Sequence, residues 1–173
     1  MSYFSIYNFG IGNAFVKFTA EYHAKKDYKH LSHLLSTGMT IGAMIAVIIL
    51  CILFLWTEEM LMFFDVNPDN LADATFVLLG VGITTAFMMT FNVYGAVLTG
   101  IQRLDIKNYT HVLILTFEFF GTVILLNMGH GIRAVTLTYA TGLLITTLIY
   151  FFIVKKLRPE LSIHPLNLSL IHI

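Results

Sequence analysis

The sequence predicts an all-α, multi-pass transmembrane helical bundle, and two observations carry that prediction. The chain has 173 residues, of which 57% are apolar and only 12% are charged, and its mean hydropathy is +0.80. Soluble domains carry roughly 25% charged residues, so this composition argues against an ordinary soluble domain. The apolar residues are also gathered into long stretches, and a helix of about 20 mostly apolar residues crosses the hydrocarbon core of a bilayer.

Five hydrophobic segments are expected to form membrane-spanning helices, at about residues 3–24, 31–57, 71–101, 106–128 and 132–156. Residues 74–101 contain no charge, and Glu118 is the one charged residue of 110–128. The first segment is the weakest, because it contains Asn8, Asn13 and Lys17. Segments of this length favour helices over barrel strands, which are about 10 residues of alternating polarity.

The charged loops predict how the bundle is oriented. If the five segments alternate, one side carries eight of the ten basic residues, which are Lys25, Lys26, Lys29, Arg103, Lys107, Lys155, Lys156 and Arg158. The other side carries a loop with five acidic residues and a loop with Arg133. Basic residues concentrate in cytoplasmic loops, so we expect the first side to be cytoplasmic and the N-terminus to lie outside.

The chain is expected to be a piece of a longer protein, with at least one helix before Met1 and more after Ile173. Residues 1–165 would then hold the helices of this piece, and 166–173 would be a short tail at the point of truncation. A complete protein of five helices is the alternative.

Several classes of function are disfavoured by composition and motifs. The net charge is zero, whereas nucleic-acid binding calls for a basic stripe. His23, His30 and His33 do not have an established ligand spacing, so no metal site is expected. No nucleophile elbow, phosphate loop or zinc-helix motif is present, so we expect neither an enzyme nor a cofactor.

Segment one carries a polar face. Asn13, Lys17 and Glu21 are spaced four residues apart, so they share one side of a helix. Ionisable residues inside membranes usually face a bundle interior or an aqueous cavity. Lys17 is therefore a candidate to bind an anionic group of a substrate, with Asn13 beside it. The alternative is that Lys17 extends to the cytoplasmic interface, about 12 Å away at 1.5 Å per residue.

Glu118 is a candidate ion-coupling residue. It lies in the middle of its segment, where a charge costs about 3 kcal/mol or more. Thr122 and His111 fall on the same helical face, one turn after it and two turns before it. The carboxyl group would pair with a lysine, bind a proton or bind a cation; the alternative is a protonated glutamate bonded to a neighbouring helix.

Asn92 belongs to a stripe of polar and small residues in segment three, with Thr85, Gly95 and Thr99. Small residues let membrane helices approach closely, and hydroxyls bond across helices, so helix packing is the favoured interpretation. A similar stripe, at Tyr139, Gly142, Thr146 and Tyr150, runs along segment five. Under the other interpretation such stripes line a substrate path, and Asn92 binds substrate.

Three stretches resemble one transporter family. Gly-Ile-Gly-Asn-Ala-Phe-Val-Lys-Phe-Thr-Ala-Glu-Tyr at 10–22, followed by Ala-Lys-Lys-Asp-Tyr at 24–28, is similar to the second helix and following loop of polysaccharide-biosynthesis flippases. Tyr-Gly-Ala-Val-Leu-Thr-Gly-Ile-Gln-Arg-Leu-Asp-Ile-Lys-Asn at 94–108 resembles the end of their fourth helix and its loop. Lys-Lys-Leu-Arg-Pro-Glu-Leu at 155–161 resembles the exit from their sixth. These flippases belong to the multidrug/oligosaccharidyl-lipid/polysaccharide exporter superfamily.

The resemblance covers roughly residues 1–165 and implies helices two to six of a six-helix lobe in a two-lobe transporter of about twelve to fourteen helices. It implies a carrier that flips a polyprenyl-diphosphate-linked glycan across the cytoplasmic membrane of a prokaryotic cell, with the bilayer and the rest of the transporter polypeptide as partners. A basic residue is common in the second helix of this family, where Lys17 falls, whereas Glu118 matches no family position. A cation-coupled multidrug exporter of the same fold and a non-transporting membrane assembly protein remain as alternatives.

Overall fold

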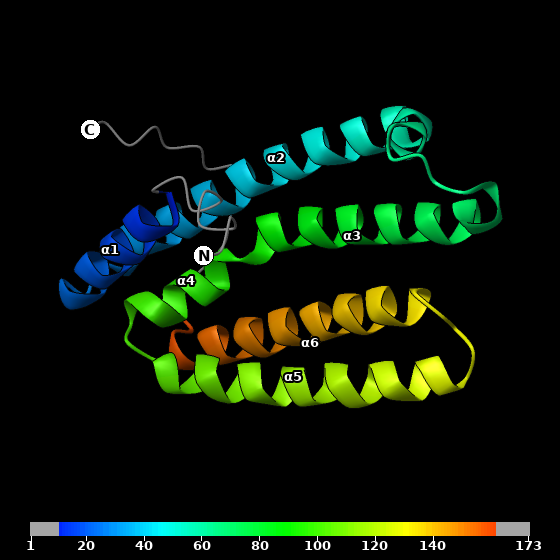
Figure 1. The fold of residues 1–173 in the computed structure, drawn as a ribbon. Coiled ribbons are helices and arrows are strands. Elements are labelled where there is room, and N and C mark those ends of the chain that lie inside the picture. The colour runs from blue at the N-terminus through cyan, green and yellow to red at the C-terminus, as the bar shows by residue number, and fades with distance from the viewer. Residues whose placement is uncertain (1–10, 162–173) are drawn as a thin grey trace.

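The computed structural model describes residues 11–161, which form a bundle of helices without a β-strand in that range (Figure 1). The elements are α1 (Ile11–Ala24), α2 (Tyr28–Phe63), the short 3-10 helix η2 (Pro68–Asn70), α3 (Leu71–Phe91), α4 (Val93–Gly100), α5 (Leu104–Asn127) and α6 (Arg133–Leu157). The predicted all-α, multi-pass class is confirmed. The start of the first predicted segment and the tail at 166–173 lie outside the described residues.

Two helices differ from the predicted segments. The segment predicted at 31–57 begins earlier, at Tyr28, because the carboxylate of Asp27 accepts a hydrogen bond of 3.1 Å from the His30 N–H and so caps the helix. The same helix continues to Phe63, although Trp56 has non-helical backbone angles (φ −119°, ψ 19°). The uncharged stretch predicted as one helix at 71–101 is divided at Asn92 into α3 and α4.

Four of the described elements have the length and composition to cross a membrane, namely Tyr28–Phe63, Pro68–Phe91, Leu104–Asn127 and Arg133–Leu157. Only 11 to 17% of their most apolar windows is buried inside the bundle, so most of this apolar surface faces outwards. A monomeric soluble protein rarely exposes large apolar patches, whereas lipid covers them at no cost. The exposed faces therefore fit a bilayer.

The two ends of the bundle carry opposite charges. The α1–α2 turn, the α4–α5 turn and the end of α6 all lie at one end in Figure 1, which we call the basic end. The α2–α3 and α5–α6 loops lie at the other end, here called the acidic end. There Asp73 binds Arg133 at 2.6 Å and ties the start of α3 to the start of α6. The helices therefore alternate in direction as the charge distribution predicts.

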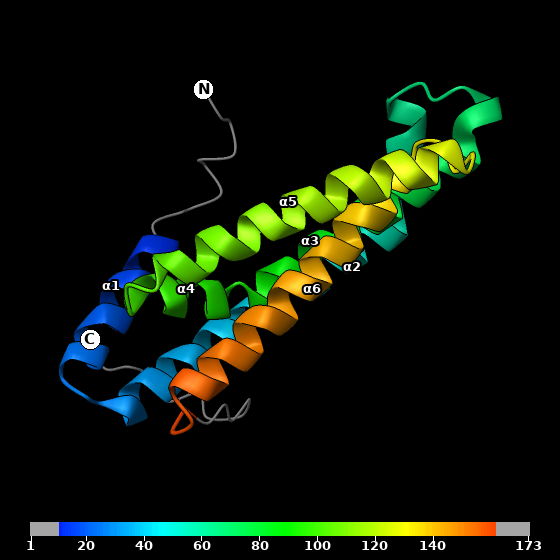
Figure 2. The ribbon, with the colours of Figure 1, turned by 90° about the horizontal axis from the view of Figure 1, so that it is seen from below.

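The buried core lies towards the basic end and is centred on α4. Six of the eight residues of α4 are buried, and Val97 and Leu98 are completely enclosed. Residues of α1, α2 and the end of α6 pack around them, including Phe15, Leu35 and Val154. This convergence of four helices holds α1 against the bundle, as Figure 2 shows from the second direction.

Glycines permit the closest helix contacts. A Cβ atom at Gly42 of α2 would lie 2.9 Å from the Met89 carbonyl carbon and 3.0 Å from Thr90 Cα, both in the backbone of α3. One at Gly100 of α4 would lie 2.5 Å from Thr19 Cγ2 of α1. Apolar side chains gain little by leaving lipid for a helix interface, so close van der Waals packing has to hold these helices together.

Substituting Gly42 is expected to loosen the α2–α3 contact. In Gly42→Ala the new methyl group meets backbone that cannot move independently, and overpacking of this kind costs about 1–3 kcal/mol. The midpoint of thermal unfolding of the purified protein should fall. Gly95→Ala is the matched control, because its Cβ would find its nearest neighbour at an ordinary 3.4 Å, on the Tyr150 ring. Equal midpoints for the two variants would contradict this account.

The charge distribution predicts opposite sides for the two ends. Single cysteines placed at Lys26 and at Asn67, with Cys51 replaced, should react with an impermeant thiol reagent from opposite faces of the membrane. Only the cysteine at position 67 should react in intact cells, and the one at 26 should need permeabilisation. Labelling of both positions from outside would refute the orientation.

Candidate functional site

α1 presents its two predicted polar residues on a face that the other described helices leave open. Phe15 and Thr19 are buried against α2 and α4, whereas Asn13 and Lys17 are exposed. Lys17 follows Phe15 by two residues and precedes Thr19 by two, so its side chain points to the opposite side of the helix. The packing of α1 therefore fixes Lys17 away from the core.

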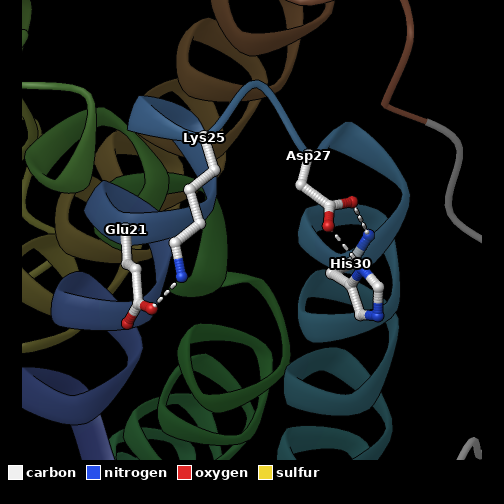
Figure 3. A network of polar contacts seen from close by, with 4 residues as sticks. All are labelled: Glu21, Lys25, Asp27 and His30. Atoms are coloured by element: carbon white, nitrogen blue, oxygen red, sulfur yellow. Dashed lines mark hydrogen bonds and ion pairs between the residues drawn. The ribbon is translucent and has the colours of Figure 1, made fainter.

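Lys17 forms no ion pair within residues 11–161, although its charge acts on the Glu21 carboxylate one turn away. The nearest acidic residue on its own face, Glu21, binds Lys25 at 2.6 Å, as Figure 3 shows. The sequence had grouped Asn13, Lys17 and Glu21 as one polar face, and the structure divides it, because Glu21 belongs to an ion pair at the basic end. Lys17 remains as a cation available to an anionic ligand.

Glu118 lies at the interface of α5 with α6. A Cβ atom at Gly142 of α6 would fall 2.6 Å from Glu118 Oε1 and 3.2 Å from its Cγ, so the absence of a side chain at Gly142 makes room for the carboxyl group. One turn along α5, Thr122 Oγ1 lies 2.8 Å from Thr138 Oγ1 of α6. These residues form a polar seam between two membrane helices, consisting of Glu118, Thr122, Thr138 and Gly142.

The seam can hold a proton or contribute to a cation site, because a carboxyl group and two hydroxyls supply oxygen atoms. Thr138 Oγ1 also donates a hydrogen bond of 2.9 Å to the Ala134 carbonyl oxygen. The proton of that hydroxyl is therefore already in use, and only the oxygen lone pairs can bind a further group. Among the described residues no group of three or more His, Cys, Asp or Glu side chains is arranged to hold a metal ion.

Asn92 marks the break between α3 and α4. It is exposed, and its Oδ1 would lie 3.5 Å from a Cβ atom placed on Gly95. Gly95 itself packs against the Tyr150 ring of α6, so the two polar and small stripes seen in the sequence meet here. That contact agrees with the helix-packing interpretation for Gly95 and Tyr150. Asn92 lies at its edge, with its side chain accessible.

The structure does not bring the predicted site residues into one cluster. Lys17 lies on α1, Asn92 at the α3–α4 break and Glu118 in the α5–α6 seam. Within residues 11–161 no ion pair joins Lys17 to Glu118; the pairs that form involve Glu21, Asp27, Asp73 and Asp105. The lysine partner considered for Glu118 is therefore not Lys17 in this conformation.

Sequence reasoning missed two features. Lys107 Nζ donates a hydrogen bond of 2.8 Å to Thr99 Oγ1, across the turn that joins α4 to α5. A hollow of about 630 Å³ opens at the acidic end between α2 and α3, lined by residues that include Phe54, Glu58, Glu59 and Leu79. Neither feature has a motif: each depends on how two consecutive helices pack.

The fold, with four helices long and apolar enough to cross a membrane among the described residues, defines a polytopic helical membrane protein. A family model described as MatE matches residues 1–124, which is more than two thirds of the chain. The chain therefore belongs to the MatE family, and it is a membrane exporter of the multidrug/oligosaccharidyl-lipid/polysaccharide superfamily. Members of this family are transporters and not enzymes. No curated protein and no solved structure matches the chain.

Proposed function

We propose that this exporter flips a polyprenyl-diphosphate-linked glycan across the cytoplasmic membrane, and that Lys17 helps to hold the diphosphate. The observation that carries the proposal is the position of Lys17: it is exposed on the open face of α1 and forms no ion pair among residues 11–161. A cation attracts an anion strongly where water is scarce, and a diphosphate supplies the negative charge that would pair with the Lys17 ammonium group.

The substrate class is supported by the same helix. Residues 10–28, which include Asn13 and Lys17, resemble the second helix of polysaccharide-biosynthesis flippases, and the family match includes them. Asn13 lies one turn from Lys17 and is also exposed, so its amide is a second donor for a phosphate or sugar oxygen. Asn92 would add a further polar contact. In this proposal the remaining transporter polypeptide covers the open face of α1.

A cation-coupled multidrug exporter is the second candidate, and Glu118 is the observation that favours it. A carboxyl group in a membrane helix can alternate between protonated and ionised as the transport path opens to each side. Its place in the α5–α6 seam also fits a static role as a hydrogen-bond donor. The MatE match is equally compatible with both substrate classes, and it argues against a non-transporting assembly protein.

Removing the Lys17 charge is expected to stop glycan export. In the full-length protein, Lys17→Ala should lower export by roughly tenfold or more at unchanged membrane levels, since about 1.4 kcal/mol of lost anion binding is tenfold, and Lys17→Arg should retain part of the activity. Lys29→Ala is the control, because Lys29 is an exposed lysine at the start of α2. Full export by Lys17→Ala would exclude the proposed role and leave extension to the interface as the explanation for Lys17.

Glu118→Gln separates ion coupling from packing. The substitution keeps the shape and hydrogen-bonding capacity of the side chain but cannot ionise, and the Thr122–Thr138 contact remains to hold the seam. If Glu118 couples transport, the full-length variant should fold, bind substrate and fail to respond to an ion gradient imposed across vesicles. The control is Glu160→Gln, an exposed carboxylate beyond α6. Unchanged gradient-driven transport in Glu118→Gln would make this residue structural.

A further inference from the structure

A side-chain contact at the basic end joins the last turn of α1 to the residue that follows α6. Arg158 follows α6, and its Nη2 lies 3.2 Å from Nε2 of His23, in the last turn of α1. The guanidinium of Arg158 also lies over the Tyr28 ring, 5.3 Å from its centroid, where α2 begins. One side chain therefore links the end of α6 to both sides of the α1–α2 turn.

Buried residues lie next to this contact on both sides. Thr19, one turn before His23 on the same face of α1, is completely buried, and Leu161, three residues after Arg158, is 6% exposed. Arg158 Nε and His23 Nδ1 are both enclosed and have no hydrogen-bond partner within residues 11–161. Both side chains are thus partly removed from water, and electrostatic interactions between them are stronger than at an open surface.

The chemistry of the contact requires a neutral histidine. A guanidinium has five N–H donors and no acceptor, so the nitrogen of His23 that faces it has to accept. His23 then carries its proton on Nδ1. Protonation would remove the acceptor lone pair and place two cations side by side in a half-buried position.

The other charged groups near the turn do not offset that repulsion. Glu21 is bound to Lys25 at 2.6 Å, and Asp27 is bound to the ring of His30 at 2.7 Å (Figure 3). The hydrogen bond from the His30 backbone N–H, together with the ring, holds the pKa of Asp27 below its ordinary value. From α6, Lys155 lies over the Phe151 ring. Arg158 is the charged group whose field acts on His23.

We propose that the His23–Arg158 contact is a proton-sensitive anchor that fixes the basic end of α1, and with it Lys17, to the end of α6. Arg158 is a positioning residue in this proposal, which rests on the proposed function only for the role of Lys17. The anchor is formed when His23 is neutral and is lost as pH falls. Burial, together with the Arg158 charge, holds the pKa of His23 below its ordinary value while the contact is made. A released imidazole titrates at about pH 6.5, so the anchor weakens as pH falls below that value, and acidification of the side that carries the basic end would release α1.

Backbone hydrogen exchange tests the anchor without a transport assay. The full chain is measured at pH 8 and pH 5.5, with each rate corrected for intrinsic exchange. Amides of residues 20–31 should open roughly tenfold more readily at the lower pH, since a hydrogen bond to a charged group contributes about 1.5–3 kcal/mol.

Two variants and a control complete the test. His23→Gln keeps an acceptor but cannot be protonated, so its corrected exchange should be the same at both pH values. Arg158→Gln should exchange fast at both. His33→Gln, on α2 and not among the side-chain partners of Arg158 within residues 11–161, should keep the wild-type pH dependence. The anchor is overturned if wild-type exchange does not change with pH, or if His23→Gln retains the full change.

Transport provides a separate readout. In the full-length protein, export should fall between pH 8 and pH 5.5 on the side of the basic end, and His23→Gln should make it independent of pH over that range. A pH profile of His23→Gln that matches wild type would overturn the anchor. If no variant exports the glycan at any pH, the proposed function fails, and the exchange measurement still decides on the anchor.

Discussion

The absence of water in the hydrocarbon core is the constraint on which the rest of this structure depends. Each backbone N–H and C=O group there needs a partner within the protein, and helices supply one along their own length. Threonine hydroxyls follow the same rule: those of Thr90, Thr116 and Thr146 donate to carbonyl oxygens four residues earlier in their helices. Polar side chains can therefore be numerous in these helices without forming a site. Only those whose polar groups are not bonded to the backbone of their own helix are candidates for function.

Lipid also removes the force that packs helices in water, which explains why the contacts of this bundle depend on glycine. Gly42 admits the α3 backbone, Gly100 admits Thr19, and Gly142 admits the Glu118 carboxyl group. The last contact serves both interpretations of Glu118, because a carboxyl group can bond a neighbouring helix and still titrate. The position of Glu118 is therefore compatible with a packing role and with an ion-coupling role. Only an experiment that depends on the charge of its carboxyl group distinguishes the two roles.

The bundle is tightly packed at one end and open along one helix. α4 is almost entirely enclosed by α1, α2 and α6 at the basic end, where the His23–Arg158 contact also lies. The opposite side of α1 carries Asn13 and Lys17 without a cover in residues 11–161. A rigid support behind an exposed cation is a suitable arrangement for binding an anion, since the support fixes the position of the charge.

The sequence by itself determined the class of protein and the separation of basic from acidic loops. The class follows from composition and segment length, which act locally, and the family match agrees with it. It also identified Lys17 and Glu118 as unusual, because charge in an apolar segment is visible in one dimension. Only the tertiary structure decided that α3 and α4 are separate at Asn92, that Glu118 faces Gly142, and that Glu21 forms its ion pair with Lys25. Arg158 and His23 are 135 positions apart, and no local pattern encodes their contact. It exists because the helices return to the same end of the bundle, which is a property of the packed chain.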